Sequence, residues 1–257
     1  MPSVFFCFYW IEEFLKQKAA EVTLINRPRR FGKTLAMSML ASFFDVRKDS
    51  RELFSGLYIA QKQELCKAWM NQYPLLFLTF KDVDGLTFES AKDMLRMQIA
   101  QIYNEHCYLL FSERVNQNDK LIFEQLVDPV NGRPTDSMLK VSILLLMRML
   151  QAHCGKSVIL LLDEYDVPLA KASQHGYYDE MLEMIRSILS TALKDNISLR
   201  FAVITGCLRI SKESIFTGTN NFVSDTISDT RLNEYFGFLD KEIDQILTDS
   251  GQEDKKM

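Results

Sequence analysis

The stretch Arg27-Pro28-Arg29-Arg30-Phe31-Gly32-Lys33-Thr34 decides the fold that this sequence predicts. A short apolar run, Val22 to Asn26, precedes it, and a run of strong helix formers, Leu35 to Leu40, follows it. A strand, a turn, Gly-Lys-Thr and a helix make up the context of the phosphate-binding P-loop motif. In that arrangement the N–H groups of the turn and the positive end of the helix dipole point at one polyphosphate.

One position departs from the full pattern G-x-x-x-x-G-K-[ST], because Arg27 stands where its first glycine is expected. The remaining residues suggest roles: Lys33 would reach the β- and γ-phosphates of a nucleotide, and the Thr34 hydroxyl would ligate Mg²⁺. Arg29 and Arg30 have an alternative reading as plain loop charges. The residues that we expect to contact ATP form one segment, Arg29, Arg30, Phe31, Gly32, Lys33, Thr34 and Leu35.

A second motif is the unbroken apolar run Val158 to Leu162, which ends in Asp163 and Glu164. Such a run predicts a strand that is buried on both faces. Asp163 at its carboxyl end fits the acid that, with a P-loop threonine, holds Mg²⁺ through water, and Glu164 fits the carboxylate that polarises the attacking water. The alternative is that both acids simply end a strand in solvent.

A third run, Leu199 to Thr205, predicts another strand that ends in a polar residue. We expect this strand beside the acidic one, with Thr205 hydrogen-bonded to the γ-phosphate or to the attacking water; the alternative for Thr205 is a helix cap. Hydrolysis by positioning and electrostatics is slow until an arginine completes the site. Arg209, in cis or toward a neighbouring subunit, is the first candidate, Lys212 is the second, and either has the alternative reading of a solvated charge.

Strands and helices alternate along the chain. Pro74 introduces a strand over Leu75–Phe80, Ser90 is expected to cap a long helix, and Asp128 to Asp136 is a loop. Further helices are predicted over Ile11–Lys18, Leu35–Phe44, Ser137–His153 and Tyr178–Leu193. This order predicts an α/β fold of the P-loop NTPase type, with a mainly parallel sheet, helices on both faces and a ligand site at the carboxyl ends of the strands.

The composition excludes several classes of protein. The chain of 257 residues is 25% charged and 47% apolar, which is typical of a globular α/β domain, and its net charge of −4 argues against direct DNA binding through a broad basic face. The five cysteines show no Cys-x-x-Cys spacing, which favours a reducing, cytoplasmic location. The apolar N-terminal run, Val4 to Trp10, is too short to span a membrane.

Three motifs in order resemble the bacterial AAA-ATPase-like family: the stretch 27–34, the string Asp163-Glu164-Tyr165-Asp166-Val167-Pro168, and Thr205-Gly206 with Ser214 to Asn221. The resemblance runs from about Ile11 to the C-terminus. It implies that an arginine at position 27 is normal, and that Lys33, Thr34, Asp163 and Glu164 are the residues for ATP and Mg²⁺. Members of this family usually carry a PD-(D/E)XK nuclease-like domain after the ATPase part.

Both ends differ from that family's pattern. Relatives have an extra segment before the P-loop strand and continue for another domain after Phe236-Gly237-Phe238, whereas this sequence stops at Met257. We therefore divide the chain into an AAA-ATPase-like P-loop domain, 1–235, and the start of a truncated C-terminal helical segment, 236–257. Glu253-Asp254-Lys255 fits a short Glu-x-Lys string by chance in a polar tail, so we expect no nuclease activity from this chain alone.

The function predicted from these residues is Mg²⁺-dependent ATP hydrolysis that drives or gates an attached or partner effector, nuclease-like in the family. A homo-oligomer is a further possible partner. The alternative is a nucleotide-dependent switch that does not hydrolyse ATP. A small-molecule kinase is disfavoured because no acceptor-binding domain is visible, and a GTPase because no Asn/Thr-Lys-x-Asp string follows the acidic strand.

Overall fold

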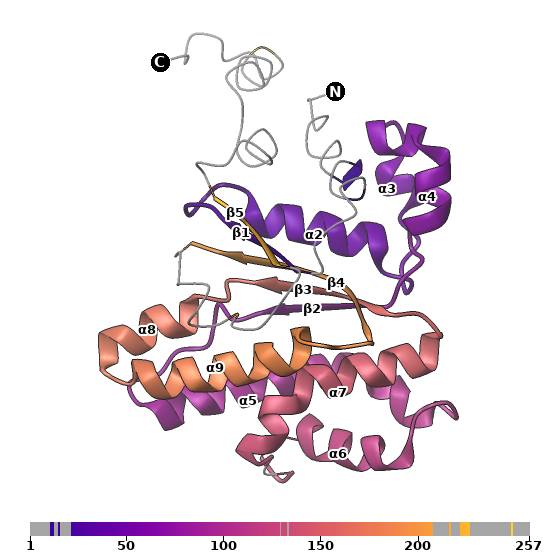
Figure 1. Ribbon diagram of the computed structural model, residues 1–257. Coiled ribbons are helices and arrows are strands. Elements are labelled where there is room, and N and C mark those ends of the chain that lie inside the picture. Colours follow the sequence, from indigo (N-terminus) through magenta and orange to yellow (C-terminus); the bar gives the residue numbers. More distant parts are fainter. Residues whose placement is uncertain are drawn as a thin grey trace.

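A five-stranded, parallel sheet lies at the centre of the computed structural model (Figure 1). The structure describes residues 11–12, 15, 22–128, 130–132, 134–207, 216, 222–226 and 248. The strand order is β2-β3-β4-β1-β5, and every pair of neighbours is parallel. The strands of the described part are β1 Val22–Asn26, β2 Leu75–Thr79, β3 Val158–Asp163, β4 Leu199–Gly206 and β5 Phe222–Asp225.

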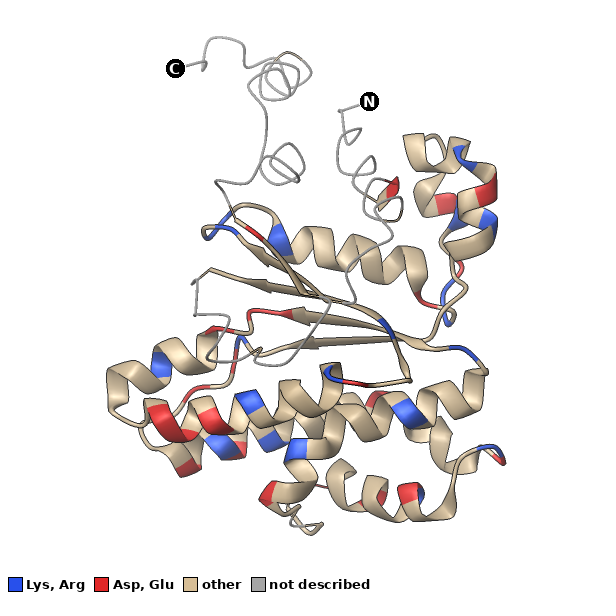
Figure 2. Ribbon diagram, in the orientation of Figure 1, with Lys and Arg blue, Asp and Glu red and all other residues tan. Residues whose placement is uncertain are grey.

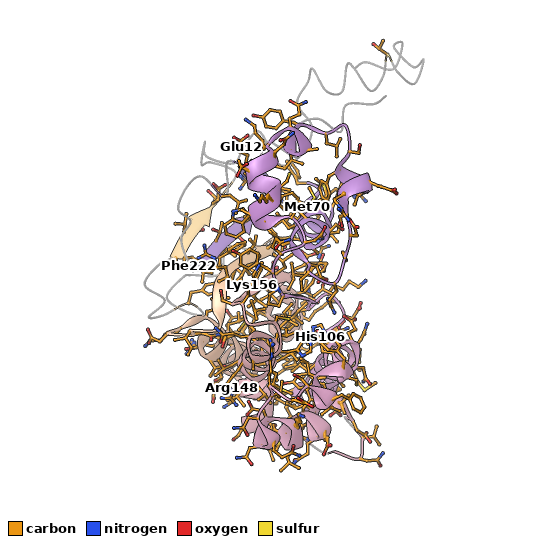
Figure 3. All side chains as sticks on the ribbon, turned by 90° about the vertical axis from the view of Figure 1, so that its right-hand side faces the viewer. Glu12, Met70, His106, Arg148, Lys156 and Phe222 are labelled. Carbon is orange, nitrogen blue, oxygen red and sulfur yellow. The ribbon has the colours of Figure 1, made fainter. Side chains whose placement is uncertain are left out.

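Helices cover both faces of the sheet, so the predicted α/β architecture is confirmed (Figure 1). Helix α2 lies on one face, with α3 and α4 near its end, and α5, α7 and α9 lie on the other face, with α6 outside them. Figure 3 shows the layers from the side: Phe222 and Lys156 lie at the level of the sheet, Met70 lies toward α2, and His106 and Arg148 lie among the helices of the opposite face. The helical bounds are α2 Lys33–Phe44, α3 Arg51–Phe54, η2 Tyr58–Gln61, α4 Gln63–Trp69, α5 Phe88–Glu105, η3 Cys107–Phe111, α6 Gln117–Val127, α7 Asp136–Cys154, α8 Val167–His175 and α9 Tyr178–Leu193.

Burial on both faces explains the unbroken apolar run of β3. All six residues of this strand are buried. Ile159 and Leu161 pack in the cluster that includes α2, whereas Leu160 and Leu162 pack in the larger cluster of α5, α7 and α9. Because side chains alternate along a strand, Asp163 falls on the α2 face, as does Thr205 at the end of β4.

The boundaries follow local sequence signals, with one correction. We expected Ser90 to cap the long helix, but Thr87 is the cap of α5: its side chain accepts the Ser90 N–H, and the Ser90 hydroxyl accepts the Thr87 N–H in return. Thr87 has extended backbone angles, as an N-cap residue requires, while Ser90 is already helical. Helix α7 begins after Thr135 and ends at Gly155 (φ 73°), close to the prediction.

Some predictions fall outside the described residues. These include most of the helix expected over Ile11–Lys18 and the boundary between the segments 1–235 and 236–257, which therefore stay predictions. Helices α4, α6 and α8 and strand β5 were not predicted. Within the described parts of the chain, no helix is both long and apolar enough to cross a lipid bilayer.

Candidate functional site

The loop between β1 and α2 presents bare helical N–H groups at the carboxyl end of the sheet. Arg30 (φ 69°) and Gly32 (φ 71°) both adopt left-handed conformations, which turn the chain sharply into α2. The first turn of α2 has no side-chain cap and contains no acidic residue. The positive end of the helix dipole and its first N–H groups are therefore free to meet an anion.

The ammonium of Lys33 lies across the inner side of this loop. Its Nζ donates to the backbone carbonyls of Arg27 and Pro28, both at 2.9 Å, and contacts Cys207 Sγ at 3.2 Å. The side chain is buried, so these acceptors replace most of its contacts with water. The loop thus places a positive charge in front of the N-terminus of α2.

Asp163 accepts hydrogen bonds from two threonines at once. Thr34 Oγ1 donates to Asp163 Oδ2 at 2.7 Å, and Thr205 Oγ1 donates to Oδ1 of the same carboxylate. Asp163 is only 2% exposed and Thr205 is fully buried. The P-loop threonine and the acid of β3, 129 residues apart in the sequence, are therefore in direct contact.

The contact between Thr205 and Asp163 was not foreseen. The sequence led us to expect Thr205 to face the γ-phosphate or the attacking water, and that role stays a prediction. β4 does lie beside β3, as expected. The hydroxyl of Thr205 donates to the carboxylate of Asp163 and so helps to orient it.

Glu164 follows Asp163 and turns out of the strand with a left-handed φ of 56°. Burial raises the pKa of the Glu164 carboxyl, and the neighbouring Asp163 and Asp166 raise it further, while Lys33 and Lys81 lower it. A carboxyl whose pKa is shifted upward toward neutrality is a better proton acceptor than one at its ordinary value.

Two adjoining cavities meet at Glu164 and Arg29. The first cavity has a volume of about 410 Å³ and is lined by Arg29, Arg30, Gly32, Lys33, Thr34, Leu35 and Glu164. Six of the seven residues expected to contact ATP therefore line it, with Phe31 as the exception. The second cavity, of about 750 Å³, runs along α8 and past Lys81 and Cys207.

Figure 2 places opposite charges at the same end of the sheet: basic residues gather in the loop before α2, and acidic residues follow β3. Of the residues proposed for the site, all of the segment from Arg29 to Leu35 except Phe31 line one cavity with Glu164, and Thr34 and Thr205 both contact Asp163. Arg209 and Lys212 lie outside the described residues, so the arginine expected to complete the site stays a prediction.

Sequence reasoning missed Asp166 and Cys207. The buried Asp166 Oδ2 accepts the backbone N–H of Cys207 at 3.0 Å, and this contact joins the turn after β3 to the end of β4. Gly206 makes the approach possible, because a Cβ there would lie 2.5 Å from Tyr165 Cε1 and 2.7 Å from Asp166 Oδ1. The signals were a third acid, three residues after Asp163, and a glycine after Thr205.

Comparison with known proteins identifies a family. Residues 9–216 match the AAA-ATPase-like family, described as predicted AAA-ATPase. This chain belongs to that family. A protein of Azotobacter chroococcum mcd 1, described as an uncharacterized protein in the vnfD 5'region, is 26% identical over 223 residues, which are 86% of this chain and 37% of that protein. The AAA-ATPase-like chain thus spans little more than a third of this curated relative, and no solved structure matches it.

Proposed function

We propose that this protein binds Mg·ATP at the start of α2 and hydrolyses it, and that turnover drives or gates an effector. One observation carries the proposal: Thr34, in the first turn of α2, donates to Asp163 of β3 beside a cavity that Lys33 and Glu164 both line. An ammonium, a hydroxyl and two carboxylates are the groups that phosphoryl transfer by positioning and electrostatics needs.

The residues of the first cavity fit a triphosphate. The uncapped turn of α2 supplies N–H donors, and Lys33, held by the carbonyls of Arg27 and Pro28, supplies a positive charge. Arg29 and Arg30 line the same cavity, and neither forms an ion pair with another residue of the described part. The exposed side chain of Leu35 offers an apolar surface at its edge.

The same site fits Mg²⁺ by the chemistry of its donors. Mg²⁺ takes oxygen ligands, keeps several waters, and is held in proteins by one or two oxygen side chains together with substrate phosphates. The Thr34 hydroxyl and the Asp163 carboxylate, 2.7 Å apart, would hold it. When bound, Mg²⁺ neutralises charge on the phosphate oxygens.

Glu164 is the residue that we assign to the attacking water. Its carboxylate accepts a proton from water as the water oxygen bonds to the γ-phosphorus and the bond to the bridging oxygen of ADP breaks. Its raised pKa suits this transfer. Lys33 stabilises the charge that develops on the leaving side, while Thr205 keeps Asp163 in place.

The wider assignments rest on the family and on composition. The effector is proposed as a nuclease-like domain or protein, and a homo-oligomer as a further partner; the greater length of the Azotobacter protein supports the idea of an attached part. Each cysteine in the described part is unpaired, which supports the proposal of a reducing, cytoplasmic location.

Glu164→Gln tests the proposal against a switch that binds ATP without turnover. We expect this variant to lose Mg²⁺-dependent phosphate release by at least about a hundredfold, as is typical for loss of a general base, and to keep its affinity for ATP. Glu180→Gln, on the exposed surface of α9, is the matched control and should behave as wild type. A wild-type protein that binds ATP with no more phosphate release than Glu164→Gln would instead be the non-hydrolysing switch.

A further inference from the structure

Arg27, which stands in place of the first glycine of the motif, makes a buried ion pair with β5. Its Nη2 lies 2.6 Å from Asp225 Oδ1, and each side chain is 1% exposed. Its Nη1 donates to the backbone carbonyls of Asn26 at 3.0 Å and of Asp225 at 3.2 Å. One guanidinium thus contacts the end of β1, through the Asn26 carbonyl, and the end of β5, through the carboxylate and the carbonyl of Asp225.

The backbone of Arg27 connects the same residue to the phosphate loop and to β4. Its N–H donates to the carbonyl of Gly206 at 3.2 Å, and its own carbonyl accepts from Lys33 Nζ at 2.9 Å. Any shift of Arg27 therefore moves one of the acceptors that hold the Lys33 ammonium. The position of that charge depends on how firmly Arg27 is fixed.

A glycine is not needed at position 27 in this structure. The left-handed steps of the loop fall at Arg30 and Gly32, and Arg27 is not among the residues of positive φ. A side chain is therefore tolerated here, and its guanidinium reaches a carboxylate that lies 198 residues further along the sequence. A buried ion pair is costly to desolvate and rarely adds more stability than a well-packed apolar pair, so a role in fixing one local arrangement is its best-attested use.

We propose that Arg27 and Asp225 are positioning residues that hold the phosphate loop in its nucleotide-binding shape and couple it to β5. The proposal rests on the proposed function, because the loop must bind a nucleotide for its shape to matter. Coupling between two sites is reciprocal: if an intact pair favours nucleotide binding, a bound nucleotide must favour the intact pair. Nucleotide binding should therefore make β5 separate from β1 less often.

Arg27→Gly provides the sharpest test, since it completes the motif as G-P-R-R-F-G-K-T while it removes the ion pair. Arg27→Lys keeps the charge but loses the forked geometry, and Asp225→Asn keeps the shape but loses the charge. Asp45→Asn is the matched control, because Asp45 is also a buried carboxylate paired with an arginine, Arg47 at 2.9 Å, at the other end of α2. The probe is a fluorescent N-methylanthraniloyl ATP, titrated with Mg²⁺ into proteins whose folding is first checked by thermal melting.

We expect all three variants of the pair to bind the probe at least about tenfold more weakly, which corresponds to the loss of one charge-assisted hydrogen bond, while Asp45→Asn stays within about twofold. Binding of Arg27→Gly at or above the wild-type level would overturn the proposal, since a restored glycine would then suffice. Should single variants unfold, Arg27→Met with Asp225→Leu removes both charges together. Wild-type affinity in that double variant would equally overturn it.

Amide hydrogen exchange separates coupling from general stability. In wild type, Mg·ATP should slow exchange at Val223 and Ser224 of β5, and in Arg27→Lys the nucleotide should leave their exchange unchanged at saturation. Equal protection in both proteins would contradict the coupling. Failure of the proposed function looks different: the wild-type protein itself would not bind the probe, or Lys33→Ala would bind it as well as wild type.

Discussion

The phosphate loop is held differently on its two sides. On the β5 side, Arg27 and Asp225 form a full ion pair from which water is almost excluded. On the β3 side, the contacts are two neutral hydroxyls on Asp163, next to an open cavity and the half-buried Glu164. The difference separates two tasks, because a buried ion pair fixes a shape, whereas the Thr34 hydroxyl lines the cavity and is within reach of a ligand.

The largest expected effect is on the free energy of unfolding, which should differ between the two sides of the loop. Asp225→Ala should lower the free energy of unfolding by about 3–5 kcal/mol, because it leaves the Arg27 guanidinium buried without its partner. Asp163→Asn should cost much less, since the amide keeps the shape and can still accept from the hydroxyl of Thr34. Urea denaturation followed by circular dichroism measures both. Equal losses would contradict the division of tasks.

Thr205→Val should have a smaller effect that falls on both stability and turnover. The change keeps the volume but removes one of the two hydroxyl donors to Asp163, which costs about 1.5–3 kcal/mol for a hydrogen bond to a charged group. Because Asp163 then loses its fixed orientation, ATP turnover should fall more than ATP affinity. Thr205→Ser, which keeps the hydroxyl, is the control. A Thr205→Val protein with wild-type turnover would show that Thr34 alone orients the acid.

Arg30→Gly tests the loop between the two sides. Arg30 has a left-handed φ, which costs a non-glycine residue about 1–2 kcal/mol. Glycine avoids this cost but has more conformational freedom in the unfolded chain, so the net stabilisation of the folded protein should be up to about 1 kcal/mol. Arg29→Gly, where φ is not positive, should destabilise instead. Thermal melting without nucleotide compares the two. A loss of stability in Arg30→Gly would mean that its side chain contributes more than its backbone costs.

The smallest expected effect is a shift along the pH axis. Because burial raises the pKa of Glu164, this residue stays protonated up to a higher pH than an exposed glutamate does. As pH is lowered, turnover should therefore begin to fall at a higher pH than it would with an exposed glutamate. The effect on stability has the opposite sign. The folded protein binds this proton more tightly than the unfolded chain, so the stabilisation that protonated Glu164 gives to the folded protein is lost as pH rises through its raised pKa. The pH dependence of stability in Glu164→Gln should lack this fall. A pH profile of turnover that falls on the acid side at the pKa of an ordinary glutamate would contradict the assignment of Glu164 as the base.

Much of the fold could be predicted because its signals are local. The unbroken run of β3 has no polar residue to place in water, so it predicts a buried strand that ends at Asp163. Gly32, Lys33 and Thr34 occur directly before a run of helix formers, and α2 does begin at Lys33. The carboxyl ends of parallel strands meet at one edge, which is why Thr34 and Asp163 could be expected together.

What could not be predicted depends on contacts between distant parts of the sequence. Strand β5 has only four residues, Phe222–Asp225, and the partner of its charged residue, Asp225, is evident only when β5 is placed beside β1. Helix α8 is short, and its second residue is Pro168; a proline at this place in the sequence is equally compatible with a loop. The hydroxyl of Thr205 had two plausible partners, and only the register of β3 on β4 brings it to Asp163.

The central claim is that the groups around the first cavity bind one Mg²⁺-bound triphosphate. Isothermal titration of ATP with Mg²⁺ into wild type, Lys33→Ala and Lys48→Ala tests it most directly, since Lys48 is an exposed lysine beyond the other end of α2. The account predicts saturable binding to wild type and Lys48→Ala, and loss of binding in Lys33→Ala with its fold intact. Equal binding of ATP to all three proteins would contradict it.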